Sequence, residues 1–408
     1  MKSAVLSFVV LSCAVLAGCS GAASSPGPSD EAAGQGGTGG ASPGAGSSGS
    51  GAVSGGAGSG AASGGAGSNG AASGGSAASG GSAASGGHGG AGGGPPVLGD
   101  GPDGFAAVEG YGVRTTTGGA GGPVVTVSTT EEFLDYIARP GPHVIQVAGT
   151  ITLPTGTTDG MHDVTSHKTI IGLGADATLT GGGLKIGLPV DDAITSPPPE
   201  AVHNIILRNL KITGASDDLI NIQMFSHHIW IDHCDLSNGG DGALDIKRGS
   251  DLITVSWNHF YDHTKTCLLG HDELGAPQDT GRLRVTYHHN FFDRSDQRNP
   301  RVRFGEPVHV YNNYYNDNSY GIASTWNAGV VAEGNYFFSV NNPGRVIFED
   351  NNPGRMIARD NTLVDCNHEI EVAGPVVEPS TYYGYALDSS MDVPAIVMAG
   401  AGVGKIDQ

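Results

Sequence analysis

A group of aspartates in the middle of the chain has the residue type that binds hard metal ions. Asp217 and Asp218 occur in the string ASDDLINI, and Asp241 and Asp245 occur in GGDGALDIK. If GGDGALDIK is a strand, Asp241 and Asp245 point to one side of it, because side chains alternate along a strand. Carboxylates that converge without a matching cation suit Ca²⁺, with waters and substrate oxygens completing its shell. The alternative is that these aspartates are solvated, because SDD and GGDG are also ordinary turn strings.

Basic residues are concentrated shortly after these aspartates, in a chain that is otherwise strongly acidic. The 408-residue protein has 20 Lys and Arg against 40 Asp and Glu, which gives a formal net charge of −20. Six of the 20 basic residues nevertheless lie between positions 282 and 303. The string RNPRVRFG contributes Arg298, Arg301 and Arg303, and Lys265 precedes it in DHTKTCLLG. A strip of cations beside a carboxylate cluster predicts a site for an anionic polymer.

Other residues with chemical potential are assigned to packing. The strings FSHHIWIDH and VTYHHN bring histidines together, but no thiolate or carboxylate completes a compact transition-metal set. Cys234, Cys267 and Cys366 are expected to be buried, inert thiols. The three tryptophans are assigned to the core, although Trp326 is also a candidate to flank a sugar.

Short apolar runs, each leading into an asparagine, recur through the second half of the chain. Successive asparagines are 32, 23, 22 and 26 residues apart, and a large apolar residue follows each by two positions. The pairs are Asn258 with Phe260, Asn290 with Phe292, Asn313 with Tyr315, Asn335 with Phe337, and Asn361 with Leu363. A period of roughly 20–30 residues built from short strands predicts a parallel β-helix. Its stacked turns would align the aromatic residues into ladders and the asparagine amides into a hydrogen-bonded column.

Two segments depart from this repeat. The string STTEEFLDYIA, Ser128 to Ala138, has capping residues at its start and an apolar face, which predicts a short helix covering the N-terminal end of the solenoid. The 32-residue interval contains GHDELGAPQDTG, which is expected to be a loop inserted at one corner.

The N-terminal quarter has the composition of an export signal followed by a tether. Residues 1–19 combine Lys2, an apolar stretch and the string LAGC, which resembles a lipoprotein processing box with Cys19 as the lipidated residue. The alternative is an ordinary secretory signal. Residues 20–97 are rich in Gly, Ala and Ser and are expected to be a disordered tether. Residues 98–408 then form one domain, located outside the cytoplasm or anchored at the bacterial cell surface, with an outer-membrane preference.

Five strings within the domain of residues 98–408 resemble the signature segments of the pectate lyases, polysaccharide lyase family one. They are VTSHKTIIGLGADATLTGGGL, IWIDHCDLS, DGALDIKRGSDLITVSWNHFYDHTKTCLLGHD, LRVTYHHNFFDRSDQRNPRVRFG and VHVYNNYY, in the family's order and over roughly Phe105 to Phe338. The resemblance implies an all-β fold, a right-handed parallel β-helix, that cleaves polygalacturonate by β-elimination with Ca²⁺ as cofactor.

The resemblance also implies roles for six positions of this chain. The calcium ligands would be Asp218, Asp241 and Asp245, while Asp217 matches the family pattern less well. In the pattern R-x-P-x-x-R, Arg298 occupies the place of the proton-abstracting arginine. The places of the substrate-binding residues are taken by Lys265 and Arg303.

Other functions remain open at this stage. A surface-anchored pectin-binding protein without catalysis would have the same tether, and a pectin lyase would act on the methyl-esterified polymer. A glycoside hydrolase on a similar solenoid would need two carboxylates flanking the bond. The carboxylates here are accompanied by arginines, which favours elimination. We expect a monomer with a polygalacturonate partner, no nucleic-acid partner, and membrane contact only through the N-terminal lipid.

Overall fold

The structure of the protein is a computed structural model that describes residues 101–155, 160–348 and 352–406. All of these residues belong to one compact unit, His88–Gln408. The expected signal peptide (1–19) with Cys19 and the expected tether (20–97) lie outside them. Among the described helices, none is long and apolar enough to cross a membrane.

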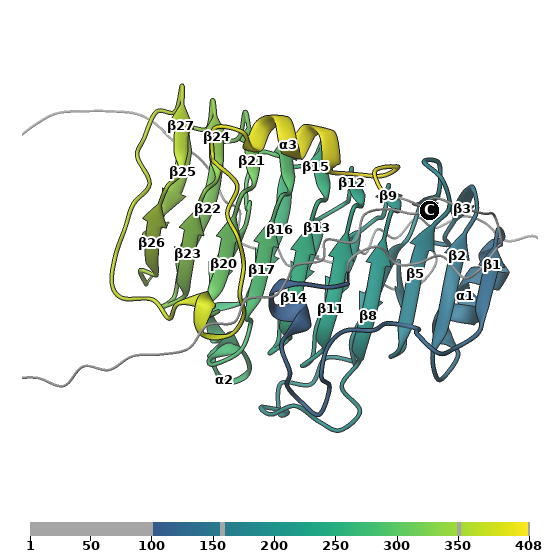
Figure 1. The fold of residues 1–408 in the computed structure, drawn as a ribbon. Helices are drawn as coiled ribbons and strands as arrows, with labels where there is room; N and C mark the ends of the chain where they lie inside the picture. The colour runs from purple at the N-terminus through teal and green to yellow at the C-terminus, as the bar shows by residue number, and fades with distance from the viewer. Residues whose placement is uncertain (1–100, 156–159, 349–351, 407–408) are drawn as a thin grey trace, which may run out of the picture. The chain divides into compact units, whose positions relative to one another are not determined.

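The described chain coils through three sheets, and each complete coil adds one strand to each sheet (Figure 1). The ten-stranded sheet contains, in spatial order, β1 (Val124–Val127), β2 (His143–Val147), β5 (Lys168–Gly172), β8 (His203–Arg208), β11 (His227–Asp232), β14 (Asp251–Ser256), β17 (Val285–His288), β20 (Val308–Tyr311), β23 (Gly329–Glu333) and β26 (Arg355–Arg359).

The nine-stranded sheet contains β3 (Thr150–Thr152), β6 (Thr178–Thr180), β9 (Lys211–Thr213), β12 (Asp235–Ser237), β15 (His259–Tyr261), β18 (Phe291–Asp293), β21 (Tyr314–Asn316), β24 (Tyr336–Phe338) and β27 (Thr362–Val364). The eight-stranded sheet contains β4 (Met161–Asp163), β7 (Gly183–Ile186), β10 (Ile220–Ile222), β13 (Gly242–Ile246), β16 (Lys265–Leu269), β19 (Arg301–Arg303), β22 (Tyr320–Thr325) and β25 (Asn342–Arg345). Neighbouring strands of each sheet run parallel, so the prediction of a parallel β-helix is confirmed.

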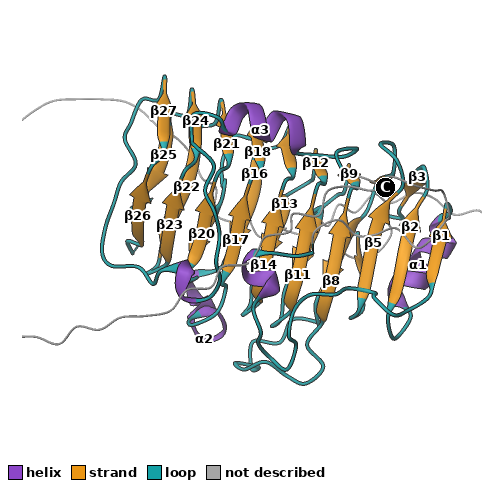
Figure 2. Cartoon of the chain, in the orientation of Figure 1, coloured by secondary structure: helices purple, strands orange, loops and turns teal. Residues whose placement is uncertain are grey.

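Helices are few and lie outside the coils (Figure 2). They are α1 (Thr130–Ala138), α2 (Ala276–Asp279), α3 (Val393–Gly400) and the 3-10 helices η1 (Gly104–Ala107), η2 (Glu273–Gly275) and η3 (Pro379–Thr381).

The predicted N-terminal helix is confirmed as α1. The Thr129 hydroxyl accepts from the Glu132 amide at 3.3 Å, and the Glu132 carboxylate accepts from the Ser128 amide at 3.2 Å. This reciprocal pair satisfies backbone donors that have no partner inside the helix. Phe133 and Ile137 are buried in the core at the first coils, so α1 covers the end of the solenoid as expected.

The asparagine column is present at the bend before the nine-stranded sheet. Asn313 illustrates its bonding: its amide nitrogen donates to the Asn335 side-chain oxygen at 3.0 Å and to the Tyr287 carbonyl at 2.9 Å. The Asn313 oxygen in turn accepts from the Asn290 backbone and side-chain nitrogens, both at 2.9 Å. The aromatic ladder is confirmed too, with Phe292 and Tyr315 ring centroids 4.9 Å apart.

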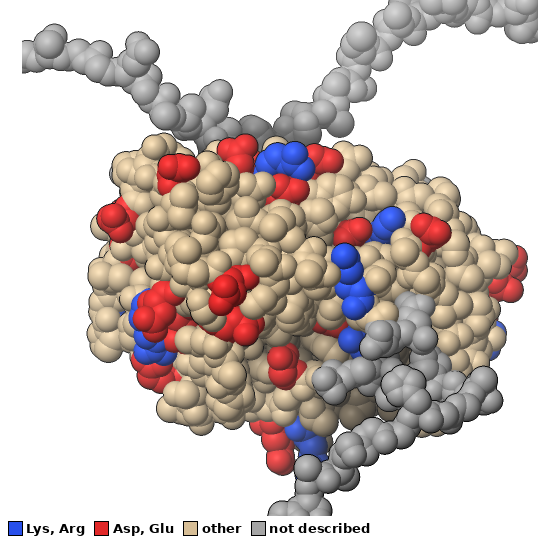
Figure 3. Space-filling view, turned by 45° about the horizontal axis from the view of Figure 1, so that its top comes forward, with Lys and Arg blue, Asp and Glu red and all other residues tan. Residues whose placement is uncertain are grey.

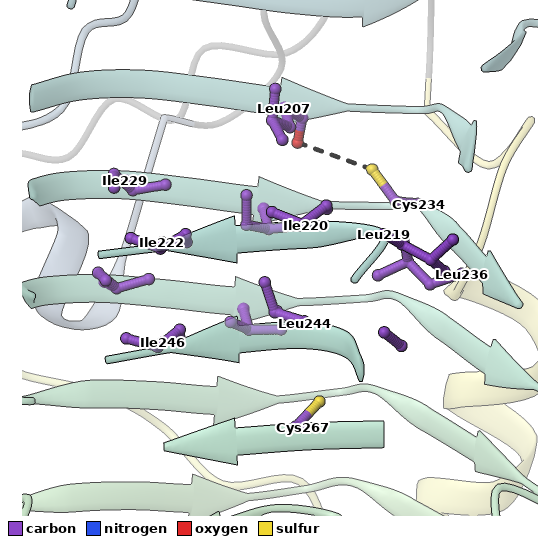
Figure 4. Packing of buried hydrophobic residues seen from close by; sticks show 14 of the residues in the cluster. Leu207, Leu219, Ile220, Ile222, Ile229, Cys234, Leu236, Leu244, Ile246 and Cys267 are labelled. Atoms are coloured by element: carbon purple, nitrogen blue, oxygen red, sulfur yellow. Dashed lines mark hydrogen bonds between the residues drawn. The ribbon is translucent and has the colours of Figure 1, made fainter. Parts of the chain in front are cut away.

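The interior of the solenoid is filled by aliphatic side chains from all three sheets (Figure 4). Ile220 and Ile222 of β10 lie next to Leu244 and Ile246 of β13, because their backbones are paired in that register. Cys234 belongs to this core, and its sulfur lies 3.8 Å from the Leu207 carbonyl oxygen. The three cysteines of the described chain are free thiols, and Cys366 is only partly buried.

Candidate active site

Three carboxylates converge beside the amino-terminal ends of β10 and β13 in the eight-stranded sheet. One oxygen each from Asp217, Asp218 and Asp241 lies within 4.8 Å of the others. Asp218 is only 2 % exposed and accepts a hydrogen bond of 2.8 Å from the Gly242 amide on the next coil. Pairing of adjacent coils therefore brings Asp218 against the segment that carries Asp241.

Asp245 of β13 lies next to this group but is connected to it through a lysine. The Lys247 ammonium is 3.3 Å from an oxygen of Asp218 and 3.4 Å from an oxygen of Asp245. The other Asp245 oxygen is buried and has no hydrogen-bond partner within the described part of the chain. Burial, and then the charge of Asp218, raise the pKa of Asp245 to about 7, although Lys247 acts in the opposite direction.

This donor set fits a hard divalent cation. Burial and then the neighbouring Asp218 also raise the pKa of Asp217. The carboxylate oxygens converge, repel each other and have few hydrogen-bond partners among the described residues. A hard divalent cation prefers such oxygen ligands and would relieve their repulsion. The geometry groups Asp217 with Asp218 and Asp241. The expected trio of Asp218, Asp241 and Asp245 therefore stays a prediction.

Lys265, on the next coil, contacts the carboxylate cluster. Lys265 is the first residue of β16, and its ammonium lies 2.8 Å from an Asp241 oxygen. Both side chains are about half exposed, so either can exchange this contact for a ligand. Burial acts to raise the pKa of Asp241, but the hydrogen bond and charge of Lys265, followed by the charge of Arg298, outweigh it and lower the pKa.

The arginines lie one coil further, on and before β19. The backbone of Gln297 forms an isolated parallel β-bridge with Lys265 of β16, which places Arg298 beside that coil. Arg303 is 9 % exposed, and its guanidinium donates to the Gly270 carbonyl at 3.1 Å. Burial, and then the neighbouring Arg301 and Arg298, lower the pKa of Arg303 to about 10. The predicted basic strip beside the acidic cluster is therefore present on consecutive coils.

Strand pairing sets the spacing of side chains on the outer face of the eight-stranded sheet. Adjacent strands are roughly 4.8 Å apart, so residues paired on neighbouring strands lie about that distance apart. One row across the sheet contains Asn221, Asp245, Leu268, Arg301, Ala323 and Arg345. Figure 3, which is turned so that the top of Figure 1 comes forward, shows a different face, on which acidic side chains are scattered and basic ones are fewer.

The predicted insertion borders the site. Residues 270–281 form a loop that contains η2 and α2, and Gly270 accepts from Arg303. The Asp279 carboxylate anchors this loop to the preceding coil, since it accepts from the Gly249 amide at 2.7 Å.

Comparison with known proteins agrees with this architecture. A family model described as pectate lyase matches residues 96–406. The pectate trisaccharide-lyase of Thermotoga maritima is 38 % identical over 357 residues, covering 76 % of this chain and 90 % of that protein. The enzyme of the same name from Bacillus licheniformis is 34 % identical over 325 residues, covering 74 % and 86 %. A crystal structure of a Bacillus sp. N165 pectate lyase in complex with trigalacturonate superimposes with a TM-score of 0.62 at 28 % identity, covering 75 % and all of the two chains.

The chain belongs to the pectate lyase family. It is therefore a polysaccharide lyase, and the predicted family and enzyme class are confirmed.

Sequence reasoning on this pectate lyase overlooked one residue of the site, Lys247. Its ammonium lies between two of the proposed metal ligands. A signal was present, because Lys247 follows Asp245 by two positions, the spacing at which strand side chains share a face. Asp217 was seen in the sequence, but its place in the carboxylate group became evident only from the coordinates.

Proposed function

We propose that the site cleaves de-esterified polygalacturonate by Ca²⁺-dependent β-elimination and gives 4,5-unsaturated oligogalacturonides. The observation that carries the proposal is the meeting of Asp217, Asp218 and Asp241 with Lys265, whose ammonium touches Asp241. A site of this kind suits a substrate that is itself a carboxylate, because it offers both a cation-binding group and fixed positive charge.

In this proposal the aspartates would hold the ion. Asp217, Asp218 and Asp241 would supply converging oxygens, and the buried Asp245 oxygen that has no hydrogen-bond partner among the described residues would supply a further ligand atom. Bound Ca²⁺ would offset the negative charge of a galacturonate carboxylate, which otherwise makes the neighbouring C5 proton poorly acidic.

The basic residues bind the substrate and move the proton. Lys265 and Arg303 hold galacturonate carboxylates and oppose the charge that develops as the C5–H bond breaks. Arg298 accepts the C5 proton. The electron pair of that bond forms the C4–C5 double bond as the C4–O4 bond breaks. The departing O4 takes a proton from solvent water and becomes the hydroxyl of the other fragment, and the proton held by Arg298 returns to solvent.

An arginine base predicts an alkaline pH optimum. A guanidinium is protonated at ordinary pH, so the neutral base becomes more abundant as pH rises. We expect lyase activity to increase from neutral to alkaline pH in a rate-versus-pH profile. A maximum near pH 5 would contradict Arg298 as the base.

The decisive experiment follows ultraviolet absorbance of the unsaturated product. Purified protein is incubated with polygalacturonate and calcium, with a chelator, and with highly methyl-esterified pectin. A calcium-dependent increase on polygalacturonate supports the proposal, and activity only on the esterified polymer would favour a pectin lyase. New reducing ends without absorbance would indicate a hydrolase, and retention without products would indicate a binding protein.

A product of three sugars is a second, more specific candidate. The relatives from Thermotoga maritima and Bacillus licheniformis are both named pectate trisaccharide-lyase, and this chain covers 90 % and 86 % of their lengths. We expect unsaturated trigalacturonate to dominate from the earliest time points in chromatography of the digest. A broad ladder of early products would contradict this candidate.

We also infer that the protein acts outside the cytoplasm, attached through lipid on Cys19. The string LAGC and the Gly-rich segment that follows support this inference. Cys19→Ala is expected to move the protein from the membrane fraction to the soluble fraction of the source cells. A monomer is expected in light scattering of the soluble domain.

A further inference from the structure

A pocket whose described lining residues include two aromatic side chains and no charged ones lies at the carboxyl ends of β19 and β22. Its volume is about 380 Å³, and its lining residues are Thr280, Phe304, Trp326, Asn327, Asn352 and Pro353. None of these six residues carries a charge. The pocket lies next to a charged residue all the same, because its lining residue Phe304 directly follows Arg303, a candidate for substrate binding.

Strand register places the two aromatic rings side by side. Arg303 of β19 is paired with Thr325 of β22, so the residues that follow them, Phe304 and Trp326, occupy matching places at the bend. Their ring centroids are 5.9 Å apart, with an interplanar angle of 53°. Both residues adopt left-handed backbone conformations, φ 62° and 51°, and both are partly exposed.

The far wall of the pocket is fixed by backbone hydrogen bonds. The Trp326 amide donates to the Asn352 carbonyl at 2.6 Å, and the Asn327 amide donates to the Pro353 carbonyl at 3.0 Å. Asn327 and Asn352 are exposed, as is Thr280 of the inserted loop. The pocket is therefore lined by two aromatic rings together with exposed hydroxyl and amide groups.

This chemistry suits a neutral sugar. Apolar sites with a few polar groups bind small ligands, and amide and hydroxyl groups can pair with sugar hydroxyls. A galacturonate carboxylate would meet no Lys or Arg among the lining residues, and desolvating an unpaired charge is unfavourable. The aspartate and arginine site, whose Arg303 directly precedes Phe304, has the opposite character.

We propose that the Phe304–Trp326 pocket is a subsite for a neutral pyranose of the pectic polymer, continuing the proposed substrate site beyond Arg303. The inference rests on the proposed function, because it assigns the pocket to a part of the same substrate. Two sources share this chemistry: a methyl-esterified galacturonate of the main chain, or a neutral sugar of a side chain.

Calorimetric titration of the purified protein with two neutral probes tests the proposal directly. The probes are fully methyl-esterified trigalacturonate and a β-1,4-galactan tetrasaccharide. At least one should bind the wild type, and the one that binds identifies the source. Trp326→Ala should weaken that binding about tenfold, because alanine removes the apolar ring surface that contacts the C–H face of the sugar. Trp326→Phe, which keeps an aromatic ring, should stay within about threefold of the wild type.

Leu274→Ala is the matched control, since Leu274 is 86 % exposed on the inserted loop and does not line this pocket. It should bind the neutral probe as the wild type does. Thermal melts of each variant show whether it is folded. Failure of the wild type to bind either probe, or equal binding by folded Trp326→Ala, would overturn the proposal.

A kinetic measurement connects the pocket to turnover. The ratio of kcat/KM on partly methyl-esterified or side-chain-bearing pectin to kcat/KM on polygalacturonate should fall several-fold in Trp326→Ala. An unchanged ratio would contradict the assignment of the pocket to the substrate-binding site. Titration does not require catalysis, so a wild type that binds the neutral probe without lyase activity would contradict the proposed function and leave the neutral subsite standing.

Discussion

The asparagine column and the outer face of the eight-stranded sheet are built by the same stacking of coils, with opposite chemical results. In the column, one residue type repeats, and each interior amide is paired with the next: Asn258 with Asn290, Asn290 with Asn313, and Asn313 with Asn335. On the sheet face, each coil contributes a different side chain, so Asp245 and Arg301 lie in one row with Leu268 between them.

The difference indicates that the asparagine column stabilises the fold, whereas the outer face of the eight-stranded sheet carries the functional side chains. Repetition lets every coil satisfy the polar groups of its neighbour, which is favourable in a buried setting. The sheet face lacks that repetition. Among the described residues it leaves a buried Asp245 oxygen without a hydrogen-bond partner, and burial is the main cause that raises the pKa of that carboxyl to about 7. Conflicts of this kind are typical of functional sites.

The strongest test of the charged face is Arg298→Lys. Lysine keeps the positive charge but cannot reproduce the guanidinium geometry, so turnover should fall at least about a hundredfold, as for loss of a general base. Binding of trigalacturonate should persist in titration. Arg294→Lys is the control, because Arg294 is 61 % exposed and pairs with the adjacent Asp293. Substantial residual turnover in Arg298→Lys would contradict the proposed base.

Metal removal should also abolish activity, and here the effect should be reversible. A chelator should reduce product absorbance to background, and excess calcium should restore it. Calcium at about 100 times its dissociation constant should stabilise the wild type by about 2.7 kcal/mol. This stabilisation should be lost in Asp218→Asn and retained in Asp163→Asn, whose exposed carboxylate pairs with Lys185 on the same sheet. Equal calcium stabilisation of both variants would contradict the assignment.

Asn313→Ala should break the column while sparing the site. The change leaves buried groups of Asn290, Tyr287 and Asn335 without partners, which should cost about 3 kcal/mol in the free energy of unfolding. Urea titration measures this loss, and lyase activity of the folded fraction should stay near wild type. Asn361→Ala, at the partly buried end of the column, should cost less. Equal losses would show that the column does not act as a stack.

The smallest expected effect concerns a carboxylate on the ten-stranded sheet, outside both regions. Glu333 accepts from His309 at 2.8 Å and from Arg359. Burial acts to raise the pKa of Glu333, but these hydrogen bonds outweigh it and lower the pKa to about 2. A lowered folded-state pKa contributes stability above the unfolded value of about 4.3, and that contribution disappears as pH falls towards 2.

Glu333→Gln should therefore be less stable than the wild type by about 2 kcal/mol at pH 7 and nearly equal to it near pH 2. Denaturation curves across this range measure the difference. The exposed Glu369→Gln serves as control and should follow the wild type at each pH. A constant difference across the range would indicate that packing, and not charge, is responsible.

Several features of this protein could be read from the sequence alone. The spacing from Asn258 to Asn361 predicted the coils, because an amide that must find its partner one turn later imposes a period on the chain. The string STTEEFLDYIA predicted α1, since capping and amphipathicity are local properties. The tail could not be read. There α3 covers Phe291, Tyr314 and Tyr336, a contact between segments far apart in the chain.

The composition of the site was also predictable, but its connections were decided by the fold. Asp218, Asp241, Lys265 and the arginines were identified from residue types and family resemblance. The coordinates added Asp217 to the carboxylate group and placed Lys247 between Asp218 and Asp245. Which atoms meet across two coils depends on their register and on the bends between strands. Those are set by packing along the whole solenoid, and a short string of residues does not contain them.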